Sequence, residues 1–504
     1  MKKIYILFIL YLFSPQIQAQ TEWIQKGVDI DGETSSDRSG SAVSMSSDGG
    51  TLAIGSRGNS GGGNVAGHVR VYYWNGANWI QKGMDIDGEA PNDESGWAVS
   101  MNSDGNTLAI GAIYNDGIGV DAGHVRIYNW NGSNWIQKGA DIDGEMANEH
   151  SGFSVSMSSD GNTLAIGATE NSGTDTYAGH VRVYNWNGSS WDQKGADIDG
   201  EGWDDRSGHS ISMSSDGNTL AIGAPRNSGI WPIAGHVRIF NWNGTNWTQK
   251  GADIDSETAN HYMGWSISIS SDGNTLAIGA SEDTTSIPYE GHVGHVRVYN
   301  WNGTLWTQKG LDIDGEMIDD NSGRSVSISS DGNTVAIGAH YNAGLGLKTG
   351  HVRVYEWNDA SIWVQKGIDI DGEAINDQSG YSVSISSNGK ILAIGAPWNS
   401  GTSYQAGHVR VYEFPVPGAG LLENDLSDEL IVYPNPTTGS FSIKFESTQQ
   451  STVIKLTDLA GREVQSKTYY NSQLLNLNIE ESTGVYLLII ESDDKRAVIQ
   501  IVKK

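Results

Sequence analysis

The stretch Trp79–Trp130 reads WIQKGMDIDGEAPNDESGWAVSMNSDGNTLAIGAIYNDGIGVDAGHVRIYNW, and edited copies of it fill most of the chain. Each copy opens with a tryptophan followed by x-Gln-Lys-Gly and closes with Gly-His-Val-Arg. A fixed period of about 56 residues marks a repeat protein, so the fold has to be derived from the repeat. The opening tryptophans are Trp23, Trp79, Trp135, Trp191, Trp247, Trp306 and Trp363.

Four segments of each repeat have the pattern of short β-strands, as the third complete copy illustrates. We expect strands at Ser154–Ser158, Thr163–Ala168 and His180–Trp186, and a fourth that starts at Trp191. Ser-Asp-Gly-Asn separates the first two strands and Asn-Gly separates the last two. Both sequences favour hairpins because Asn and Gly tolerate positive φ. Consecutive strands are therefore predicted to be antiparallel neighbours.

Seven such units predict an all-β fold, a seven-bladed β-propeller of four-stranded blades over residues 20–414. A parallel β-helix is the rival, but its coils do not need a hairpin at every corner. Trp23–Ile30 resembles a fourth strand without the first three, and the last copy ends at Phe414 without a fourth. We therefore expect Trp23–Ile30 to complete the blade of residues 379–414 and close the ring.

The repeat is similar to the FG-GAP repeat of integrin-α-type propellers. The resemblance rests on Gly152–Ser156, Asp160–Ala168 and Gly179–Tyr184, and on the Gly-Ala-Pro at Gly223–Pro225. It implies a propeller of that type over about residues 21–414. Family members that bind calcium carry Asp-x-Asp-x-Asp-Gly between the first two strands. Here that turn is only Ser-Ser-Asp-Gly-Asn, so the family's calcium site is not transferred.

Composition narrows the function classes. The formal net charge of −29 argues against nucleic acid as a partner, because phosphates demand a basic surface. The chain has no cysteine, which excludes disulfides and thiolate metal sites. Met1–Ala19 has the basic start and short apolar centre of a secretory signal peptide; a membrane anchor is the weaker interpretation. We expect no transmembrane segment in the rest of the chain, and a monomer.

The tail differs from the repeats. Pro415–Glu429 has the composition of a linker, and Leu430–Lys504 is expected to be a small β-sandwich. The tail resembles the type A C-terminal sorting domain of the type IX secretion system, which implies recognition by that machinery, passage through the periplasm, and a secreted or outer-surface product. An ordinary appended sandwich is the alternative. The residues that carry the resemblance are Tyr433, Pro434, Asn435, Pro436, Val453–Asp458, Gly461, Gly484 and Tyr486.

Differences between the copies gather on one predicted face. Antiparallel order puts the loops between strands two and three, and between blades, on the same side, and these loops vary most. The position after the first-strand glycine also varies and should stand near the central axis. We expect it to bind a ligand, with packing at the channel mouth as the alternative. The residues at this position are Ser41, Trp97, Phe153, His209, Trp265, Arg324 and Tyr381.

An acidic stretch, Asp-Ile-Asp-Gly-Glu, is a second candidate site. Hard cations need six to eight oxygen ligands, and closely spaced carboxylates supply them, so calcium is a candidate cofactor. The alternative is a solvated turn capped by its own backbone. The histidine and arginine of each Gly-His-Val-Arg are expected to hydrogen-bond within their own blade. The candidate metal ligands are Asp29, Asp31, Glu33, Asp85, Asp87, Glu89, Asp312, Asp314 and Glu316.

The favoured function is a secreted or surface-displayed, non-enzymatic binding or adhesion protein whose ligand is an extracellular glycan or protein. The alternative is a propeller hydrolase or lyase that degrades extracellular polysaccharide, and a structural matrix role is a third possibility. No catalytic residue is assigned, because near-identical copies offer no evident asymmetric cluster. An active site would be sought first in repeat five, at His261 and the longer loop Ser281–Val293.

Overall fold

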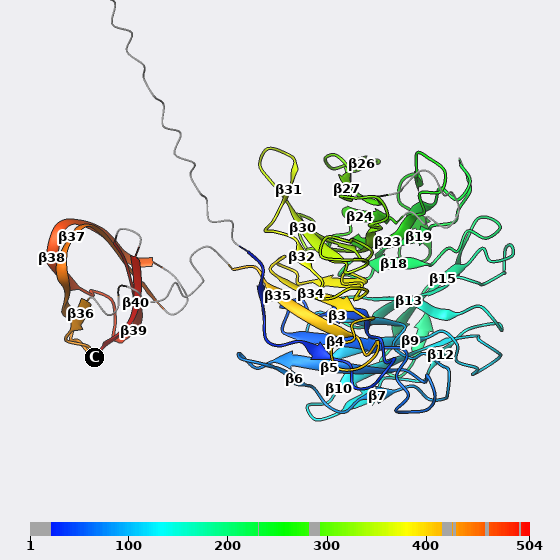
Figure 1. The fold of residues 1–504 in the computed structure, drawn as a ribbon, viewed down its shortest axis with the longest axis horizontal. Helices are drawn as coiled ribbons and strands as arrows, with labels where there is room; N and C mark the ends of the chain where they lie inside the picture. The colour runs from blue at the N-terminus through cyan, green and yellow to red at the C-terminus, as the bar shows by residue number, and fades with distance from the viewer. Residues whose placement is uncertain are drawn as a thin grey trace, which may run out of the picture. The chain divides into compact units, whose positions relative to one another are not determined.

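The computed structural model describes residues 22–229, 231–281, 293–415, 426, 430–458, 463–492 and 495–504. The expected signal peptide, most of the expected linker and most of the loop Ser281–Val293 lie outside these residues. The chain forms two compact units, Met1–Phe414 and Pro415–Lys504. All regular elements of the described residues are β-strands (Figure 1).

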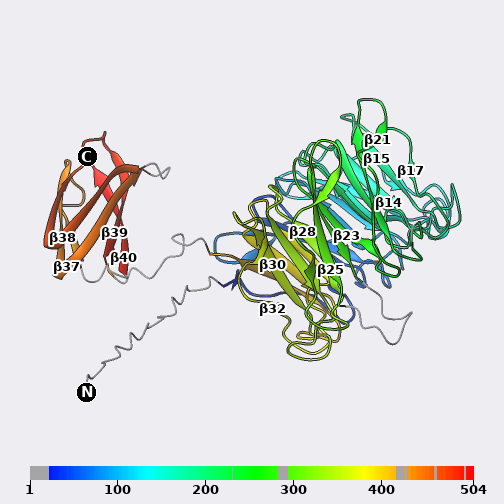
Figure 2. The same cartoon turned by 90° about the horizontal axis from the view of Figure 1, so that it is seen from above.

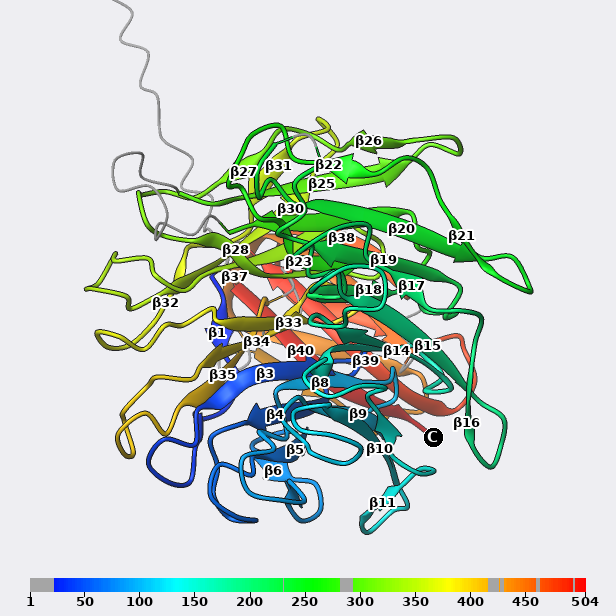
Figure 3. The same cartoon turned by 90° about the vertical axis from the view of Figure 1, so that its right-hand side faces the viewer.

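The first unit contains seven antiparallel sheets, which are the predicted blades. Figure 3 shows inner strands such as β3, β8, β18 and β28 around the centre, and outer strands such as β6, β11 and β26 at the periphery. The propeller prediction is thereby confirmed.

The bounds of the strands follow blade by blade. Blade 1 contains β3 (Ser39–Met45), β4 (Thr51–Ser56), β5 (His68–Trp74), β6 (Trp79–Gln81) and β7 (Ile86–Asp87). Blade 2 contains β8 (Ala98–Met101), β9 (Thr107–Ala112), β10 (His124–Trp130), β11 (Trp135–Gln137) and β12 (Ile142–Asp143). Blade 3 contains β13 (Ser151–Met157), β14 (Thr163–Ala168), β15 (His180–Trp186), β16 (Trp191–Gln193) and β17 (Ile198–Asp199). Blade 4 contains β18 (Ser210–Met213), β19 (Thr219–Ala224), β20 (His236–Trp242), β21 (Trp247–Gln249) and β22 (Ile254–Asp255).

The remaining blades repeat this order. Blade 5 contains β23 (Met263–Ile269), β24 (Thr275–Ala280), β25 (His295–Trp301), β26 (Trp306–Gln308) and β27 (Ile313–Asp314). Blade 6 contains β28 (Ser322–Ile328), β29 (Thr334–Ala339), β30 (His351–Trp357), β31 (Trp363–Gln365) and β32 (Ile370–Asp371). Blade 7 contains β33 (Ser382–Ile385), β34 (Ile391–Ala396) and β35 (His408–Glu413), and is completed by β1 (Ile24–Gln25) and β2 (Ile30–Asp31).

The fourth strand of each blade is broken into two short pieces, both paired with the third strand. In blade 3 the break falls at Gly195, whose φ of +84° takes the chain out of extended geometry. A Cβ at this glycine would lie 2.8 Å from Cζ3 of Trp242 in the next blade. The invariant Gln-Lys-Gly therefore lets the backbone turn against a neighbouring indole.

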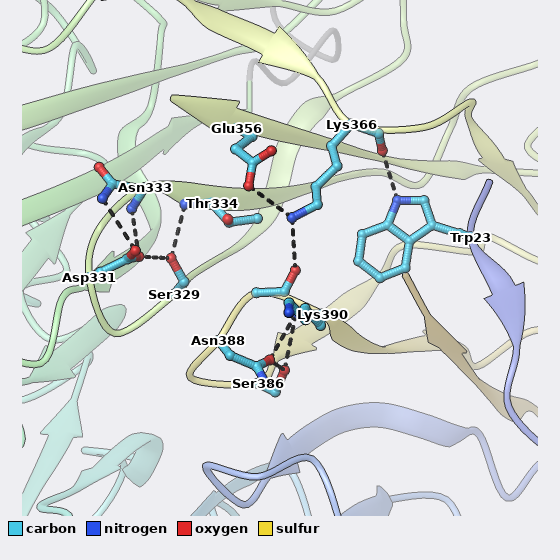
Figure 4. Close-up of polar contacts among 11 residues, drawn as sticks. Trp23, Ser329, Asp331, Asn333, Thr334, Glu356, Lys366, Ser386, Asn388 and Lys390 are labelled. Carbon is cyan, nitrogen blue, oxygen red and sulfur yellow. Dashed lines mark hydrogen bonds and ion pairs between the residues drawn. The ribbon is translucent and has the colours of Figure 1, made fainter. Parts of the chain in front are cut away.

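The predicted closure of the ring is present. β1 and β2 pair with β35 through the register Ile24↔Glu413 and Ile30↔Val409. Beside this seam, Trp23 Nε1 donates a hydrogen bond of 2.8 Å to the carbonyl oxygen of Lys366 in the preceding repeat (Figure 4). The first strands of the chain thus belong to the last blade.

The same tryptophan bond links every pair of neighbouring repeats, at 2.7–2.8 Å in all seven places. Lys26 donates to Glu413 of its own blade, whereas the lysine of five of the seven Gln-Lys-Gly segments donates to an asparagine side chain of the next blade. Lys82 Nζ donates to the Asn106 side chain, for example. Lys390 replaces this asparagine in blade 7, and Lys366 Nζ instead donates to Glu356 at 3.0 Å (Figure 4).

At the end of the channel where strands one and two are joined, seven backbone hydrogen bonds form a closed circle. Each serine amide donates to the carbonyl oxygen of the equivalent serine in the next blade, over 2.9–3.1 Å. The circle ends where it begins, because Ser387 N donates to Ser47 O. The backbone arrangement at this end of the channel is therefore the same in every blade. The serines are Ser47, Ser103, Ser159, Ser215, Ser271, Ser330 and Ser387.

The apolar cores lie between blades rather than within them. One cluster joins Ala109, Val125 and Ile127 of blade 2 to Leu164 and Ile166 of blade 3. Six equivalent clusters join the other neighbouring blades in the described residues. The second strand is buried on both faces, which explains its continuous apolar sequence.

The second unit contains β36 (Leu430–Tyr433), β37 (Ser440–Asp458), β38 (Glu463–Asn478), β39 (Gly484–Ser492) and β40 (Lys495–Lys503) (Figure 2). These strands form one five-stranded sheet around a single core rather than two separate sheets. The reason is that β37 is 19 residues long, and its two halves pair with different partners, β36 and β39.

Candidate functional site

The position after the first-strand glycine is turned out of the sheet by a β-bulge. In blade 3 the pairing passes from Ser151↔Ala168 to Ser154↔Gly167, so Gly152 and Phe153 have no partner on β14. Gly152 has a φ of +91°, and a Cβ there would lie 2.7 Å from a backbone oxygen of His124. The glycine is required by this geometry, and the bulge presents the following side chain at the inner end of the blade.

All seven side chains at this position line one cavity of about 600 Å³ at the mouth of the channel. The structure therefore brings together the residues that the sequence placed near the axis. The volume is in the range of a small-ligand site. The ring of lining residues is Ser41, Trp97, Phe153, His209, Trp265, Arg324 and Tyr381, and Arg57 joins it.

Four consecutive ring residues form an arc of aromatic faces. The ring centroids of Trp97 and Phe153 are 5.4 Å apart, and those of Phe153 and His209 are 5.0 Å apart. His209 and Trp265 follow at 4.5 Å. These contacts hold each ring in place while part of it remains exposed to the cavity, so the arc is both packed and accessible.

The rest of the ring has a different character. Arg324 Cζ lies 5.2 Å from the ring centroid of Trp265 and 4.3 Å from that of Tyr381. The next position is Ser41, which has too small a side chain to reach its neighbours' rings. Arg57 from the end of β4 lies beside this gap, with Cζ 4.4 Å from the centroid of Trp97. The mouth is therefore asymmetric, with aromatic rings on one side and guanidinium groups on the other.

The imidazole of His209 is neutral at physiological pH. Burial, aided by the positive charge of Arg324, lowers its pKa to about 3. Its Nδ1 lies 3.1 Å from the carbonyl oxygen of Trp265, which is a hydrogen bond that the Nδ1–H tautomer donates. In that tautomer Nε2 is an acceptor, so His209 offers a ligand a neutral ring rather than a cation.

The low pKa of His209 predicts a pH-dependent share of stability. The unfolded chain binds this proton near pH 6.5 and the folded chain only near pH 3, so acid favours unfolding. The titration of His209 leaves stability unchanged above pH 6.5 and lowers it progressively as the pH falls from 6.5 toward 3. Between pH 7.5 and pH 5 the wild-type protein should therefore lose about 2 kcal/mol more unfolding free energy than His209→Gln. Urea unfolding of both proteins at both pH values measures this, and equal losses would contradict it.

Sequence reasoning missed Arg57 and a second variable position, which holds Arg38 in the first repeat. The latter has positive φ in every repeat, although no glycine occupies it, with values of 49–58°. It lies two residues before the first-strand glycine, and its occupants differ widely between copies. This variation could have identified the position from the sequence. The residues are Arg38, Glu94, His150, Arg206, Tyr262, Asn321 and Gln378.

The acidic stretches are divided between neighbouring repeats. His68 gathers Asp85 of its own blade and Glu33, which follows the last strand of blade 7, with ligand atoms within 4.8 Å of one another. Asp29 belongs instead to a cluster with His408 and Glu373. Asp29 and Glu33 of one stretch are therefore directed to different clusters.

The other acids follow the same division. Glu89 joins His124 and Asp141 of the next repeat, while Asp87 Oδ1 lies 4.0 Å from His68 Nδ1. Asp312 accepts hydrogen bonds from Arg297, and Glu316 lies 3.9 Å from His351. The backbone oxygens of Asp31 and Asp314 accept bonds from Arg70 and Arg353.

Each cluster with one histidine offers few oxygens. Burial is the main reason that the pKa of His124 falls to about 4, so its imidazole is neutral. One imidazole and two carboxylates suit zinc or another transition metal better than calcium, which prefers six to eight oxygen ligands. The calcium expected from the acidic stretch thus fits these residues poorly.

The expectation that the arginine of each Gly-His-Val-Arg bonds within its own blade is wrong for six blades and holds for Arg297, which donates to Asp312 of blade 5. Arg126 of blade 2 donates from Nη2 to the carbonyl oxygen of Asp87 in blade 1 at 2.7 Å. The same bond occurs at six of the seven blades. The cause is the stacking of blades face to face, which places the outer end of one blade within reach of the next blade's third strand. These arginines join blades and do not form a site.

Repeat five shows no catalytic cluster among its described residues. His261 contacts Thr258 Oγ1 through Nε2, and its ring centroid lies 5.4 Å from that of His295. It does not line the cavity at the channel mouth.

In the second unit, the segment from Tyr433 to Pro436 lies along the edge strand β40. Asn435 donates from Nδ2 to Gln500 O at 2.6 Å and accepts from Val502 N at 3.0 Å. These bonds occupy backbone groups that an edge strand otherwise leaves open. Tyr486 is buried and donates to Ser482 O, and Gly484 begins β39; Gly461 lies outside the described residues.

Comparison with protein families identifies the second unit. Residues 431–504 match the secretion system C-terminal sorting domain. The tail therefore directs export by type IX secretion, to the cell surface or the medium. Within the described part of the chain, no helix has the length and apolar character that crossing a membrane requires.

The comparison with curated proteins finds no match. Among solved structures, a periplasmic gluconolactonase of Pseudomonas aeruginosa is similar at 14% identity, with 66% of this chain and 87% of that chain covered and a TM-score of 0.46. The Dos1 propeller covers 78% of this chain and 95% of its own at 12% identity and a TM-score of 0.40. The propeller domain of the Trilobed protease from Pyrococcus furiosus covers 70% and 90% at 11% identity and a TM-score of 0.40.

Proposed function

We propose that this protein is a non-enzymatic binding protein that captures an extracellular glycan in the cavity at the channel mouth. The observation that carries the proposal is the arc of aromatic faces from Trp97 to Trp265, which lines a cavity of about 600 Å³. Flat apolar rings with polar edges suit the faces of sugar rings, which carry apolar C–H groups and peripheral hydroxyls.

Two further observations support a binding role. Among the residues that the structure describes, the side chains that line the cavity include no carboxylate, whereas hydrolysis of a glycosidic bond ordinarily uses a pair of them. The resemblance of the repeats to FG-GAP propellers favours adhesion, and the sorting domain places the product where extracellular glycans are found. A protein ligand at the same variable face is the alternative occupant.

Trp265→Ala should weaken glycan binding about fivefold to 160-fold, because the loss of one stacked aromatic contact costs about 1–3 kcal/mol when the stacked ring is a nucleobase. A glycan array followed by titration calorimetry of the purified protein measures the effect. Tyr73→Ala is the matched control, since Tyr73 is 41% exposed at the far end of β5 and does not line the cavity. Equal affinity of Trp265→Ala and wild type would contradict the proposal. Repeating the titrations with EDTA tests whether calcium is needed.

One observation favours the enzymatic alternative, an extracellular polysaccharide lyase. Burial alone would raise the pKa of the Tyr381 phenol, but the nearby Arg324, Arg57 and Arg38 outweigh it and hold the pKa below its usual value. Such a phenol ionises at a lower pH, so more of it is available as the general base that an elimination reaction needs. Product analysis of a polysaccharide panel, with Tyr381→Phe as the control, separates cleavage from binding.

A further inference from the structure

The guanidinium side of the cavity contrasts with the charge of the whole molecule. The chain has a formal net charge of −29, yet Arg324 and Arg57 line the cavity, and Arg38 stacks over Trp398, whose ring contacts Tyr381 of the cavity. The one carboxylate in ion-pair contact with these three arginines, among the described residues, is Glu94, whose Oε2 lies 3.7 Å from Arg57 Nη1. Three guanidinium groups thus face one carboxylate, which leaves a local positive charge.

Each of the three arginines is held by an aromatic ring. Arg57 Cζ lies 4.4 Å from the ring centroid of Trp97, and Arg38 Cζ lies 5.8 Å from that of Trp398. Arg324 stacks over Tyr381. Stacking occupies the faces of a guanidinium group but leaves its edge N–H groups available for a planar anion.

Two of these arginines keep an unpartnered N–H group: the Nε atoms of Arg38 and Arg57 are buried without a hydrogen-bond acceptor among the described residues, as are those of Arg70, Arg126 and Arg226 elsewhere. What distinguishes the cavity side is charge. Arg206 on the same face bonds both Glu170 and Asp204, whereas Arg57 and Arg324 line a cavity that could admit an anionic acceptor.

The gap at Ser41 gives a ligand access to this side. The other six ring positions carry bulky side chains, whereas the hydroxyl of Ser41 turns back to donate to Arg38 O at 2.6 Å. Ser41 therefore leaves room between Tyr381 and Trp97, with Arg57 stacked on Trp97 at one side and Arg324 stacked on the Tyr381 ring at the other. A flat substituent on a sugar would meet both guanidinium groups while its ring contacts the aromatic arc.

We propose that the cavity recognises acidic sugars, and that Arg324 and Arg57 bind the carboxylate of a uronic acid residue. This inference rests on the proposed glycan-binding function and specifies its ligand. Arginine matches a carboxylate through two parallel N–H···O bonds, which a neutral sugar cannot accept in the same way. The adjoining aromatic faces favour a sugar over an acidic peptide, whose carboxylate is carried on a flexible chain.

The test uses the full chain in calorimetric titrations with three probes: oligogalacturonate or alginate fragments, their methyl esters, and a poly-glutamate peptide. The acidic fragments should bind at least tenfold more tightly than the esters. Arg324→Gln and Arg57→Gln should each weaken binding of the acid about tenfold, because each removes a charge-assisted hydrogen bond to the carboxylate. Binding of the esters should change less than about twofold in either variant.

Arg226→Gln is the matched control, because Arg226 lies on the same variable face, is 41% exposed in its side chain and pairs with Asp204. Arg324→Lys keeps the charge without the planar fork and should give an intermediate affinity, and thermal unfolding identifies any variant that fails to fold. Equal affinity for acid and ester, with both lost in Trp265→Ala, would overturn the carboxylate inference and leave glycan binding intact. Binding of the peptide alone would overturn the sugar class, and binding of no probe would overturn both.

Discussion

Replacing Trp23 by alanine is expected to lower the free energy of unfolding of the propeller by about 3–5 kcal/mol, the usual cost of removing a buried tryptophan. Trp23 is 8% exposed, packs edge-on against Phe414 with ring centroids 5.1 Å apart, and donates to Lys366 O. It stands where the ends of the repeat array meet. Its loss therefore weakens both a core cluster and the closure of the ring.

Urea unfolding at neutral pH, followed by tryptophan fluorescence, measures this change. Trp203→Ala is the control, because Trp203 is 67% exposed and its replacement should change stability by less than about 0.5 kcal/mol. Similar unfolding midpoints for Trp23→Ala and Trp203→Ala would show that the seam does not depend on this side chain.

Removal of residues 430–504 is expected to abolish delivery to the cell surface and medium, while the repeat unit still folds. The matched sorting domain covers residues 431–504, and the two units are separately compact. Export depends on recognition of the tail, and the propeller's core clusters contain no residue from it.

Immunoblots of cell and medium fractions, with and without the tail, measure export, and circular dichroism of the retained product reports folding. Attaching residues 415–504 to an unrelated periplasmic reporter is the reciprocal control and should bring the reporter outside the cell. Undiminished export of the truncated protein would show that other parts of the chain carry the export signal.

The fold was largely predictable because turn chemistry and period recur in every copy. The predicted strands Thr163–Ala168 and His180–Trp186 agree with β14 and β15 to the residue. The pairing of the first segment with the last blade followed from counting strands. The split of the fourth strand was not predicted, since it depends on how close Gly195 comes to Trp242 of another blade.

The candidate site was predicted in part. The side chain after the first-strand glycine was placed near the axis correctly. The antiparallel order of the strands and the glycine at the start of the innermost strand determine at which end of the blade this side chain lies. Arg57 was missed, since only three-dimensional closure brings the end of β4 beside the gap at Ser41. The division of Asp29 and Glu33 between clusters was also not predicted. It depends on how neighbouring blades are placed against each other, which the sequence of a single repeat does not show.

The seam between Trp23 and Lys366 joins positions 343 apart in the sequence, so it has a high contact order. A chain that emerges from a ribosome or translocon with its N-terminus first can assemble blades 1 to 6 early. It cannot finish blade 7 until the last repeat has emerged. Until then the first β-segments remain an unpaired edge, open to any strand nearby. Vectorial synthesis thus leaves the ring unsealed until its final step, and before that step the open edge can pair prematurely with a neighbouring chain.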